Sequence, residues 1–207
     1  PDVDGNTGHF IDHRPTEGGN TSPDDPEDPE EPEEEITAYK LHYYENFKGS
    51  GKYKAIDIPY GETVIISGTI YSHPGYRIVG WFTNPDGTGD EYAVNSVYDP
   101  ALFVPKNGGE DFLIIYAIWE AVNYHVEFDP NEPEGATYKG VMEKMSNLEF
   151  DTAYTLTKNQ FTCTGYLFKG WNTKADGSGD SYGDEAEIKN LTDVKGETVK
   201  LYAQWLK

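Results

Sequence analysis

The sequence predicts a mainly β chain in which an extended acidic leader precedes two tandem modules. Three observations carry this prediction: a composition rich in turn-forming and aromatic residues, a long internal repeat, and segments in which apolar and polar residues alternate. The chain has 207 residues, of which 22 are Gly, 13 are Pro and 16 are Tyr. Such a composition is typical of short strands joined by many turns. The length is sufficient for two small domains.

The acidic, Pro-rich leader spans residues 1–36 and holds 13 acidic residues and one base. Between Ser22 and Glu35 a proline stands at every third position, which is the period of the polyproline II helix. This stretch has nothing apolar to bury, and its carboxylates repel one another. We therefore expect an extended spacer without helix or sheet. The alternative is a proline-rich ligand for an aromatic groove.

An internal repeat divides the remaining residues. Gly75–Tyr92 and Gly165–Tyr182 are identical at 10 of 18 positions, and Ile115–Trp119 matches Leu201–Trp205. Both copies carry Gly-Tyr, Gly-Trp and Asp-Gly-x-Gly-Asp in the same order, so each copy is one structural unit. We place the modules at residues 37–121 and 122–207.

Within the modules, alternation with a period of two marks half-buried strands, most clearly in Tyr124–Asp129 and Val199–Trp205. Asp86-Gly87 and its counterpart Asp176-Gly177 are expected in hairpin turns. The best helix candidate is the short segment Tyr138–Leu148.

A glycine inside a predicted strand indicates a β-bulge in each module. Gly80 stands directly before Trp81, and a bulge there would bring Ile78 and Trp81 onto the same face of the sheet. The second module repeats this pattern with Phe168, Gly170 and Trp171.

The second module resembles a known family through several motifs in order: FDPN at Phe128–Asn131, FTCTGYLFKGW at Phe161–Trp171, NTKADGSGDSY at Asn172–Tyr182, NLT at Asn190–Thr192 and LYAQW at Leu201–Trp205. It is similar to the internalin B-repeat, also called the Listeria-Bacteroides repeat. The first module resembles a divergent copy, with LHYYENFKGSGKY in place of a strand and an FDPN-type turn. In the second module, EPEG at Glu132–Gly135 replaces the expected Gly-Gly.

The resemblance implies a small β-grasp-like, ubiquitin-related sheet in each module. It also implies tandem use as stalks or binding modules on bacterial surface and secreted proteins, without catalytic residues. We therefore expect an extracellular or cell-surface location.

The charge balance argues against two classes of partner. Lys and Arg total 16 against 37 Asp and Glu, a formal net charge of −21, whereas nucleic acid requires a basic surface. An anionic membrane surface is disfavoured for the same reason. No apolar run approaches the ~20 residues of a membrane span, so membrane insertion is not expected. Residues 1–10 lack the regions of a signal peptide, and we interpret the chain as a piece of a longer protein.

The sequence shows no catalytic or metal-binding constellation. The histidines are scattered, at His9, His13, His42, His73 and His125. His9, Asp12 and His13 have a helical spacing, but neighbouring Gly and Pro disfavour a helix there. Cys163 is the single cysteine, which excludes an intrachain disulfide, and no basic neighbour activates its thiol. We predict no catalytic, cofactor-binding or metal site and no cofactor.

The shared turn has a superficial likeness to a calcium loop. Asn84, Asp86, Thr88 and Asp90 occupy ligand positions, but position 12 is Asn95. The second module has Lys174 at position 1 and Glu185 at position 12. A hairpin turn explains the shared motif equally well, and weak calcium binding through acidity alone stays open.

The aromatic residues are either part of the hydrophobic core or exposed residues that contact a partner. The four tryptophans stand at equivalent positions in both modules, which favours the core over glycan platforms: Trp81, Trp119, Trp171 and Trp205. Tyrosines of the first module alone are candidate contact residues: Tyr43, Tyr44, Tyr53, Tyr60 and Tyr71.

One face differs between the modules. Where the second module has Lys169, Asn172, Lys200 and Gln204, the first has Val79, Phe82, Ile114 and Ile118. An exposed apolar face of this kind usually marks a contact. We expect the connection at residues 93–111 to cover it. The alternatives are docking of the leader through Phe10 and Ile11, a partner chain, or a bulge that changes which residues face inward.

The sequence thus predicts a non-enzymatic stalk or spacer region of a bacterial surface or secreted protein, monomeric and without nucleic-acid partners. One alternative is an adhesion or binding module for a host-surface protein, a glycan or a cell-wall polymer. Another is an accessory domain of a secreted enzyme.

Overall fold

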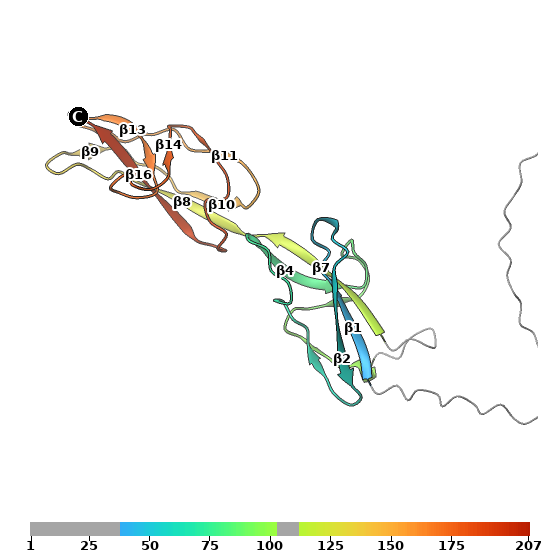
Figure 1. The fold of residues 1–207 in the computed structure, drawn as a ribbon. Coiled ribbons are helices and arrows are strands. Elements are labelled where there is room, and N and C mark those ends of the chain that lie inside the picture. The colour runs from blue at the N-terminus through green and yellow to red at the C-terminus, as the bar shows by residue number, and fades with distance from the viewer. Residues whose placement is uncertain (1–37, 103–111) are drawn as a thin grey trace, which may run out of the picture. The chain divides into compact units, whose positions relative to one another are not determined.

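The structure, a computed structural model, describes residues 38–102 and 112–207 (Figure 1). Within these ranges the chain is mainly β, as predicted, and its helical elements are two short 3-10 turns. The leader at residues 1–36, with Phe10 and Ile11, lies outside the described residues. The polyproline spacer therefore stays a prediction.

The first module contains a five-stranded sheet with the order β2-β1-β7-β4-β5. Its strands are β1 (Ala38–Tyr44), β2 (Tyr53–Pro59), β4 (Tyr76–Phe82), β5 (Glu91–Tyr92) and β7 (Phe112–Ala121). β1 is parallel to β7, and the other neighbours are antiparallel. The smaller elements are β3 (Val64–Ile65), which pairs with β6 (Val97–Tyr98), and the 3-10 turns η1 (Phe47–Gly49) and η2 (Pro100–Leu102).

The second module repeats this topology, with the order β10-β8-β16-β13-β14. Its strands are β8 (Asn123–Asp129), β10 (Met145–Glu149), β13 (Leu167–Asn172), β14 (Ser181–Tyr182) and β16 (Thr198–Leu206). β8 is parallel to β16, as β1 is to β7. Two short pairs complete the module: β9 (Tyr138–Lys139) with β12 (Thr162–Cys163), and β11 (Tyr154–Thr155) with β15 (Glu187–Ile188).

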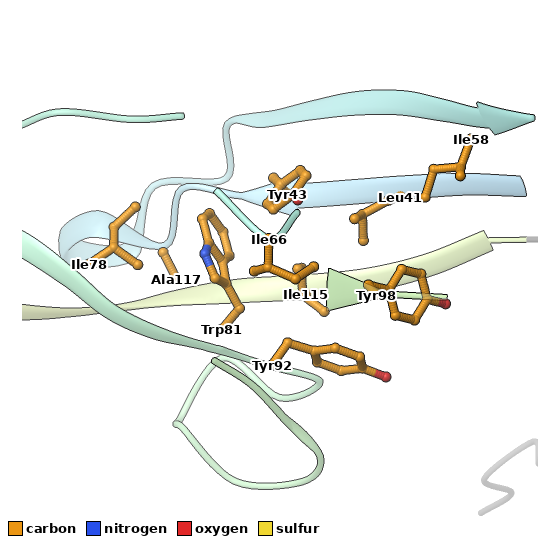
Figure 2. Close-up of a cluster of buried hydrophobic side chains, with 10 residues drawn as sticks. All are labelled: Leu41, Tyr43, Ile58, Ile66, Ile78, Trp81, Tyr92, Tyr98, Ile115 and Ala117. Atoms are coloured by element: carbon orange, nitrogen blue, oxygen red, sulfur yellow. The ribbon is translucent and has the colours of Figure 1, made fainter. Parts of the chain in front are cut away.

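Alternation along the strands places one set of side chains in each core. In the first module, Leu41 and Tyr43 on β1 and Ile115 and Ala117 on β7 are buried, while the residues between them face outward. Figure 2 shows these side chains gathered around Trp81, with Tyr92 and Tyr98 beside Ile115. The core of the second module is built on the same positions: Tyr124, Val126, Phe128, Trp171, Leu201 and Ala203.

The predicted bulges are confirmed in both modules. The register between β4 and β7 shifts between Ile78 and Gly80, and Ile78 and Trp81 are both buried. The same shift occurs between Phe168 and Gly170. At Gly170 φ is +144°, and a Cβ would lie 2.6 Å from the carbonyl oxygen of Tyr182. Only glycine fits at that position.

The helix predicted for Tyr138–Leu148 is wrong. Tyr138 and Lys139 form β9, and Met145–Glu149 forms β10. Gly140 between them has φ +102°, and a Cβ there would lie 2.1 Å from the carbonyl oxygen of Gln160. Tertiary pairing with β8 and β12 thus overrides the weak local helix preference.

The connection at residues 93–111 was expected to cover the outer face of the first sheet, which carries Val79, Ile114 and Ile118. The structure describes only residues 93–102 of this connection. Val94 and Tyr98 pack against the core instead, while Val97 and Leu102 are exposed. Residues 103–111 lie outside the described ranges. Within residues 93–102, the short pairing of β6 with β3 directs Tyr98 towards the core. Covering of the outer face by this connection therefore stays a prediction.

Candidate functional site

An asparagine at the end of the first strand fastens each module in the same way. Asn46 has φ +50°, and its Nδ2 donates to the carbonyl oxygens of Pro85 at 2.8 Å and Ala117 at 3.0 Å. Asn131 has φ +42°, and its Nδ2 donates to Ala175 and Ala203, both at 2.9 Å. The amide thereby ties the first strand to the last strand and to the hairpin turn.

The neighbouring tryptophans complete this fastening. Trp119 Nε1 donates to the carbonyl oxygen of Glu45 at 2.6 Å, and Trp205 Nε1 donates to that of Pro130 at 2.8 Å. Asn46 was not recognised in the sequence because the first module lacks the FDPN motif around it. The available signal was its position directly after an alternating strand, which matches that of Asn131.

A single residue, Val122, links the last strand of the first module to the first strand of the second. Both modules lie in one compact unit, residues 36–207. Val122 is buried; its N–H donates to the carbonyl oxygen of Gly75 at 2.8 Å, and its own carbonyl accepts the N–H of Phe150 at 2.9 Å. Gly75 has φ +73°, and a Cβ there would lie 2.3 Å from the Phe150 ring. The backbone of the first module therefore contacts the second directly.

Asp151 is the charged centre of this junction. Its carboxylate accepts hydrogen bonds from Tyr76 Oη at 2.7 Å, Lys48 Nζ at 3.1 Å and Asn190 Nδ2 at 3.1 Å. The backbone N–H of Asp151 donates to Asn190 Oδ1 at 2.6 Å, and Lys189 Nζ lies 3.5 Å from the carboxylate. Tyr76 and Lys48 belong to the first module, so their bonds to Asp151 join the two modules.

These donors change the ionisation of the groups at the junction. The hydrogen bond from Tyr76, followed by those from Asn190 and Lys48, holds the pKa of Asp151 far below its usual value. The same carboxylate raises the pKa values of Tyr76 and Lys48. The ring of Phe150 lies edge-on to that of Tyr76, with 5.9 Å between centroids. The junction thus combines backbone, apolar and charged contacts.

Glu45, Ser50 and His73 form a polar cluster that the sequence analysis missed. Ser50 Oγ donates to Glu45 Oε2 at 2.5 Å, and His73 Nε2 lies 3.1 Å from Glu45 Oε1. The bond from Ser50, more than that from His73, lowers the pKa of Glu45 against the opposing effect of its burial. In a catalytic triad the imidazole stands between the hydroxyl and the acid. Here the carboxylate stands between them, so His73 does not face Ser50 to take its proton, and the cluster orders the loop.

A second candidate surface lies on the outer side of the first sheet. We define the outer aromatic face by five residues of β1, β2 and β7: His42, Tyr44, Tyr53, Phe112 and Tyr116. His42 stacks on Tyr53 at 5.4 Å and on Phe112 at 5.5 Å, and Tyr44 stacks on Tyr53 at 5.1 Å. Tyr53 is 55% exposed, and Ile114 and Ile118 on the same side are partly exposed.

The corresponding face of the second module carries charges. Lys200 Nζ lies 3.7 Å from Glu127 and 3.5 Å from Asp129. In the strand alignment, His42 and Tyr44 replace the two acids. At these positions the second module therefore has a solvated cluster of ion pairs, whereas the first module has stacked aromatic rings.

Asn172 was predicted to lie on the polar outer face of the second module, and this prediction is wrong. It is buried, not solvent-facing, and its Nδ2 donates to the carbonyl oxygens of Gly177 at 3.2 Å and Gly179 at 3.0 Å. Its Oδ1 accepts the N–H groups of Lys174 and Gly179. Asn172 organises the hairpin turn and does not belong to a polar outer face.

Hydrogen bonds within the hairpin account for the calcium-loop likeness. Asp86 Oδ1 accepts the N–H of Thr88 at 3.0 Å and its hydroxyl at 2.6 Å, and Asn84 Nδ2 donates to Thr88 Oγ1. Asp176 accepts the N–H of Ser178 in the same way. Asn95 lies away from the turn and donates its N–H to Ile66. Among residues 38–102 and 112–207, no three His, Cys, Asp or Glu side chains are grouped to hold a metal ion.

The remaining candidates fall into the core or outside the described ranges. Trp81 and Trp171 are fully buried, as predicted, whereas Trp119 and Trp205 are only partly buried at the edges of the cores. Cys163 is a buried free thiol in β12.

The other predicted residues are dispersed. Tyr43 is buried, and its carbonyl accepts Tyr71 Oη at 2.9 Å. His125 Nδ1 accepts the N–H of Asn147. His9, Asp12 and His13 lie outside the described residues.

The repeated topology agrees with a comparison to known protein families. A family model described as the Listeria-Bacteroides repeat domain matches residues 39–101 and 124–204, one segment in each module. No solved structure matches the chain significantly. None of the helices in the described part of the chain is long and apolar enough to cross a membrane.

Two similar proteins come from Evansella cellulosilytica. One, named as a Gly-rich membrane protein, is 35% identical over 136 residues, which cover 65% of this chain and 14% of that protein. The other, named as a membrane protein, is 27% identical over 173 residues, which cover 83% of this chain and 23% of that protein. The chain thus spans less than a quarter of the length of each of these relatives.

Proposed function

Because the chain belongs to the Listeria-Bacteroides repeat domain family, we propose that its two modules form a non-enzymatic spacer in a surface-associated bacterial protein. The spacer holds another part of that protein away from the cell envelope. The names of the two relatives associate them with a membrane, which supports a surface location. In this proposal the leader ends at residue 36 and the modules divide at residues 121 and 122.

Each module is a β-grasp-related unit in this proposal. The order β2-β1-β7-β4 supports it, because the first hairpin lies at one side and the last strand is central and parallel to the first. The second module has the equivalent arrangement of β10, β8, β16 and β13.

The observation that carries the spacer function is the link through Val122. A spacer keeps two parts of a protein at a defined distance only if its units do not reorient freely relative to each other. Long flexible linkers between units give wide distributions of end-to-end distance. One buried residue, hydrogen-bonded to Gly75 on one side and Phe150 on the other, leaves little length for such motion. Asp151 adds side-chain contacts across the same junction.

Nitrogen-15 relaxation of the 207-residue chain tests this proposal. The two modules should share one rotational correlation time, and a four-residue Gly-Ser insertion after Val122 should separate them into two shorter times. The same insertion after the exposed Gly135 is the matched control and should leave the common time unchanged. Independent tumbling of the unmodified modules would reject the spacer. In the longer protein, exchange of both modules for unrelated ones of equal length should preserve surface display.

A binding module is the second candidate, and the outer aromatic face favours it. The faces of the stacked rings are turned towards one another: the interplanar angle is 24° between His42 and Tyr53 and 18° between Tyr44 and Tyr53. A sugar needs an open ring face to stack on, so this surface suits a protein or peptide better than a glycan. Tyr53→Ser should abolish such binding and leave the common correlation time unchanged, which separates this candidate from the spacer.

A further inference from the structure

The strand β2 forms an outer edge of the first sheet (Figure 1), and nothing in the described part of the chain pairs with its free side. Its pairing with β1 continues without a bulge along all seven residues. Next to this ladder, the N–H of Glu45 donates to the carbonyl oxygen of Lys52 at 2.8 Å. Hydrogen-bonded pairs alternate along an antiparallel ladder. The backbone N–H and C=O groups of Tyr53, Ala55 and Asp57 therefore point away from β1.

The equivalent edge of the second module is protected. β10 has only five residues, and a bulge interrupts its pairing with β8. In this bulge Asn147 has φ +57°, and its N–H donates to His125 Nδ1 at 3.2 Å. The strand alignment places Lys144 at the position of Ala55, and Lys144 Nζ donates to Thr198 Oγ1 at 3.1 Å. Short strands, bulges and lysines are the usual means by which proteins keep an edge strand from pairing.

The opposite edges of the two sheets are too short to receive a strand. β5 and β14 have two residues each. Among the outer strands of the two five-stranded sheets, as far as the structure describes them, only β2 is both long and regular. Its residue Ala55 is exposed. An edge of this kind presents a row of unpaired N–H and C=O groups on which another strand can pair.

We infer that β2 is an interface for β2 of a second copy of this chain, and that the two strands pair antiparallel about a two-fold axis at Ala55. In this register the Ala55 residues of the two copies face each other, and Tyr53 of each copy faces Asp57 of the other. Every outward N–H and C=O group of these residues then has a partner. Both copies use the same surface, so the assembly closes as a dimer.

The charges on β2 favour this register. Asp57 lies 3.4 Å from Lys40 Nζ of its own module, and no second carboxylate faces it across the axis. Lys54 Nζ donates to a backbone carbonyl oxygen of its own module at 2.7 Å, so its charge is directed away from the second copy. An axis at Asp57 would bring two carboxylates opposite each other, which is unfavourable. An axis at Tyr53 would leave Asp57 without a strand to pair with.

The acidic leaders do not prevent this pairing. Each leader precedes β1, whose first residue, Ala38, pairs with Pro59 at the end of β2. In the antiparallel pair, the Pro59 residues of the two copies lie on opposite sides of the axis, ~26 Å apart at ~3.3 Å per residue. Salt at physiological concentration screens charges beyond ~8 Å. The points at which the two leaders join the sheet therefore repel each other only weakly.

Sedimentation equilibrium of the 207-residue chain, from about 10 µM to about 1 mM, should show monomers and dimers and no larger species. Ala55→Lys and Ala55→Glu should each lower the association constant about fivefold or more, because two like charges then face each other at the axis. An equal mixture of the two variants should recover a dimer with one copy of each, because lysine then faces glutamate. Lys144→Glu, at the equivalent position of the second module, is the matched control and should leave the association constant unchanged.

Amide exchange locates the interface in the same samples. The N–H groups of Lys54 and Ile56, which pair with β1, should exchange slowly at every concentration, whereas exchange at Ala55 should slow in proportion to the loss of monomer. A chain that stays monomeric up to about 1 mM, as expected from the sequence, would overturn the inference. A dimer that Ala55→Lys leaves intact would do the same. Slow exchange at Ala55 at every concentration would also overturn it, because another segment of the same chain would then cover this edge.

Discussion

Asn46 and Asn131 make the same pair of side-chain hydrogen bonds from the same left-handed backbone position, although the residues around them differ. Each amide joins the end of the first strand to a carbonyl of the last strand and to one in the hairpin turn. The requirement is specific, since the position needs both a positive φ and a side-chain donor. Asparagine is the common residue that supplies both.

Asn131→Ala should therefore destabilise the second module by about 1–3 kcal/mol, because two carbonyls lose their donor and alanine disfavours the positive φ. Asn147→Ala is the matched control, since Asn147 has φ +57°, is exposed, and isolates the backbone cost. Urea denaturation measures both. Equal losses in the two variants would show that the amide hydrogen bonds contribute nothing.

The two buried tryptophans should respond differently to phenylalanine. Trp81 Nε1 donates to the carbonyl oxygen of Ser67 at 2.9 Å, whereas Trp171 Nε1 is buried with no hydrogen-bond partner in the described residues. Trp81→Phe should cost about 1 kcal/mol more than Trp171→Phe, because only the former breaks a hydrogen bond. Trp171→Ala should cost ~3–5 kcal/mol through the cavity it leaves. Denaturation followed by circular dichroism gives all three values, and a near-neutral Trp171→Ala would contradict its core position.

Gly75→Ala should loosen the junction. The new Cβ would clash with the Phe150 ring and also adopt φ +73°. Gly165→Ala is the matched control, because φ there is +81° and the space is open, so it carries only the backbone strain of about 1 kcal/mol. Relaxation measurements should show separate tumbling of the modules in Gly75→Ala alone. A common correlation time in that variant would indicate that the Phe150 contact is dispensable.

The junction should weaken in acid. The pKa of Asp151 is lowered in the folded chain from its ordinary 3.8, so its contribution is complete above that value and is lost as the pH falls below it. Asp151→Asn removes the charge at every pH. The difference in urea midpoint between the wild type and Asp151→Asn should therefore shrink when the pH is lowered from 6 to 2. A difference that does not change with pH would assign the effect to hydrogen-bond geometry instead of charge.

The sequence predicted the features that depend on local pattern. Alternation identified the buried faces of β8 and β16, and a glycine before each tryptophan identified both bulges. These succeeded because side-chain alternation and backbone steric limits act between near neighbours in the chain.

Features that depend on distant partners were missed. Residues 138–148 had weak helix propensity, but their strand pairing is with β8 and β12. Asn172 looked like a solvent-facing polar residue, yet it is buried because the turn at residues 177–181 supplies its hydrogen-bond partners. Glu45 and His73 are 28 residues apart in sequence, and only the fold brings them together. No single-sequence pattern marks such pairs.

The parallel pairing of the first and last strands determines how each module responds to pulling. Tension applied at Ala38 and Ala121 would slide β1 along β7, which loads the hydrogen bonds from Lys40–Phe112 to Tyr44–Tyr116 together. A hairpin pulled at its adjacent ends opens one bond at a time. In the second module, β8 and β16 are loaded in the same shearing direction between Thr198 and Tyr202. We therefore expect each module to resist stretching along the chain more strongly than its short strands suggest.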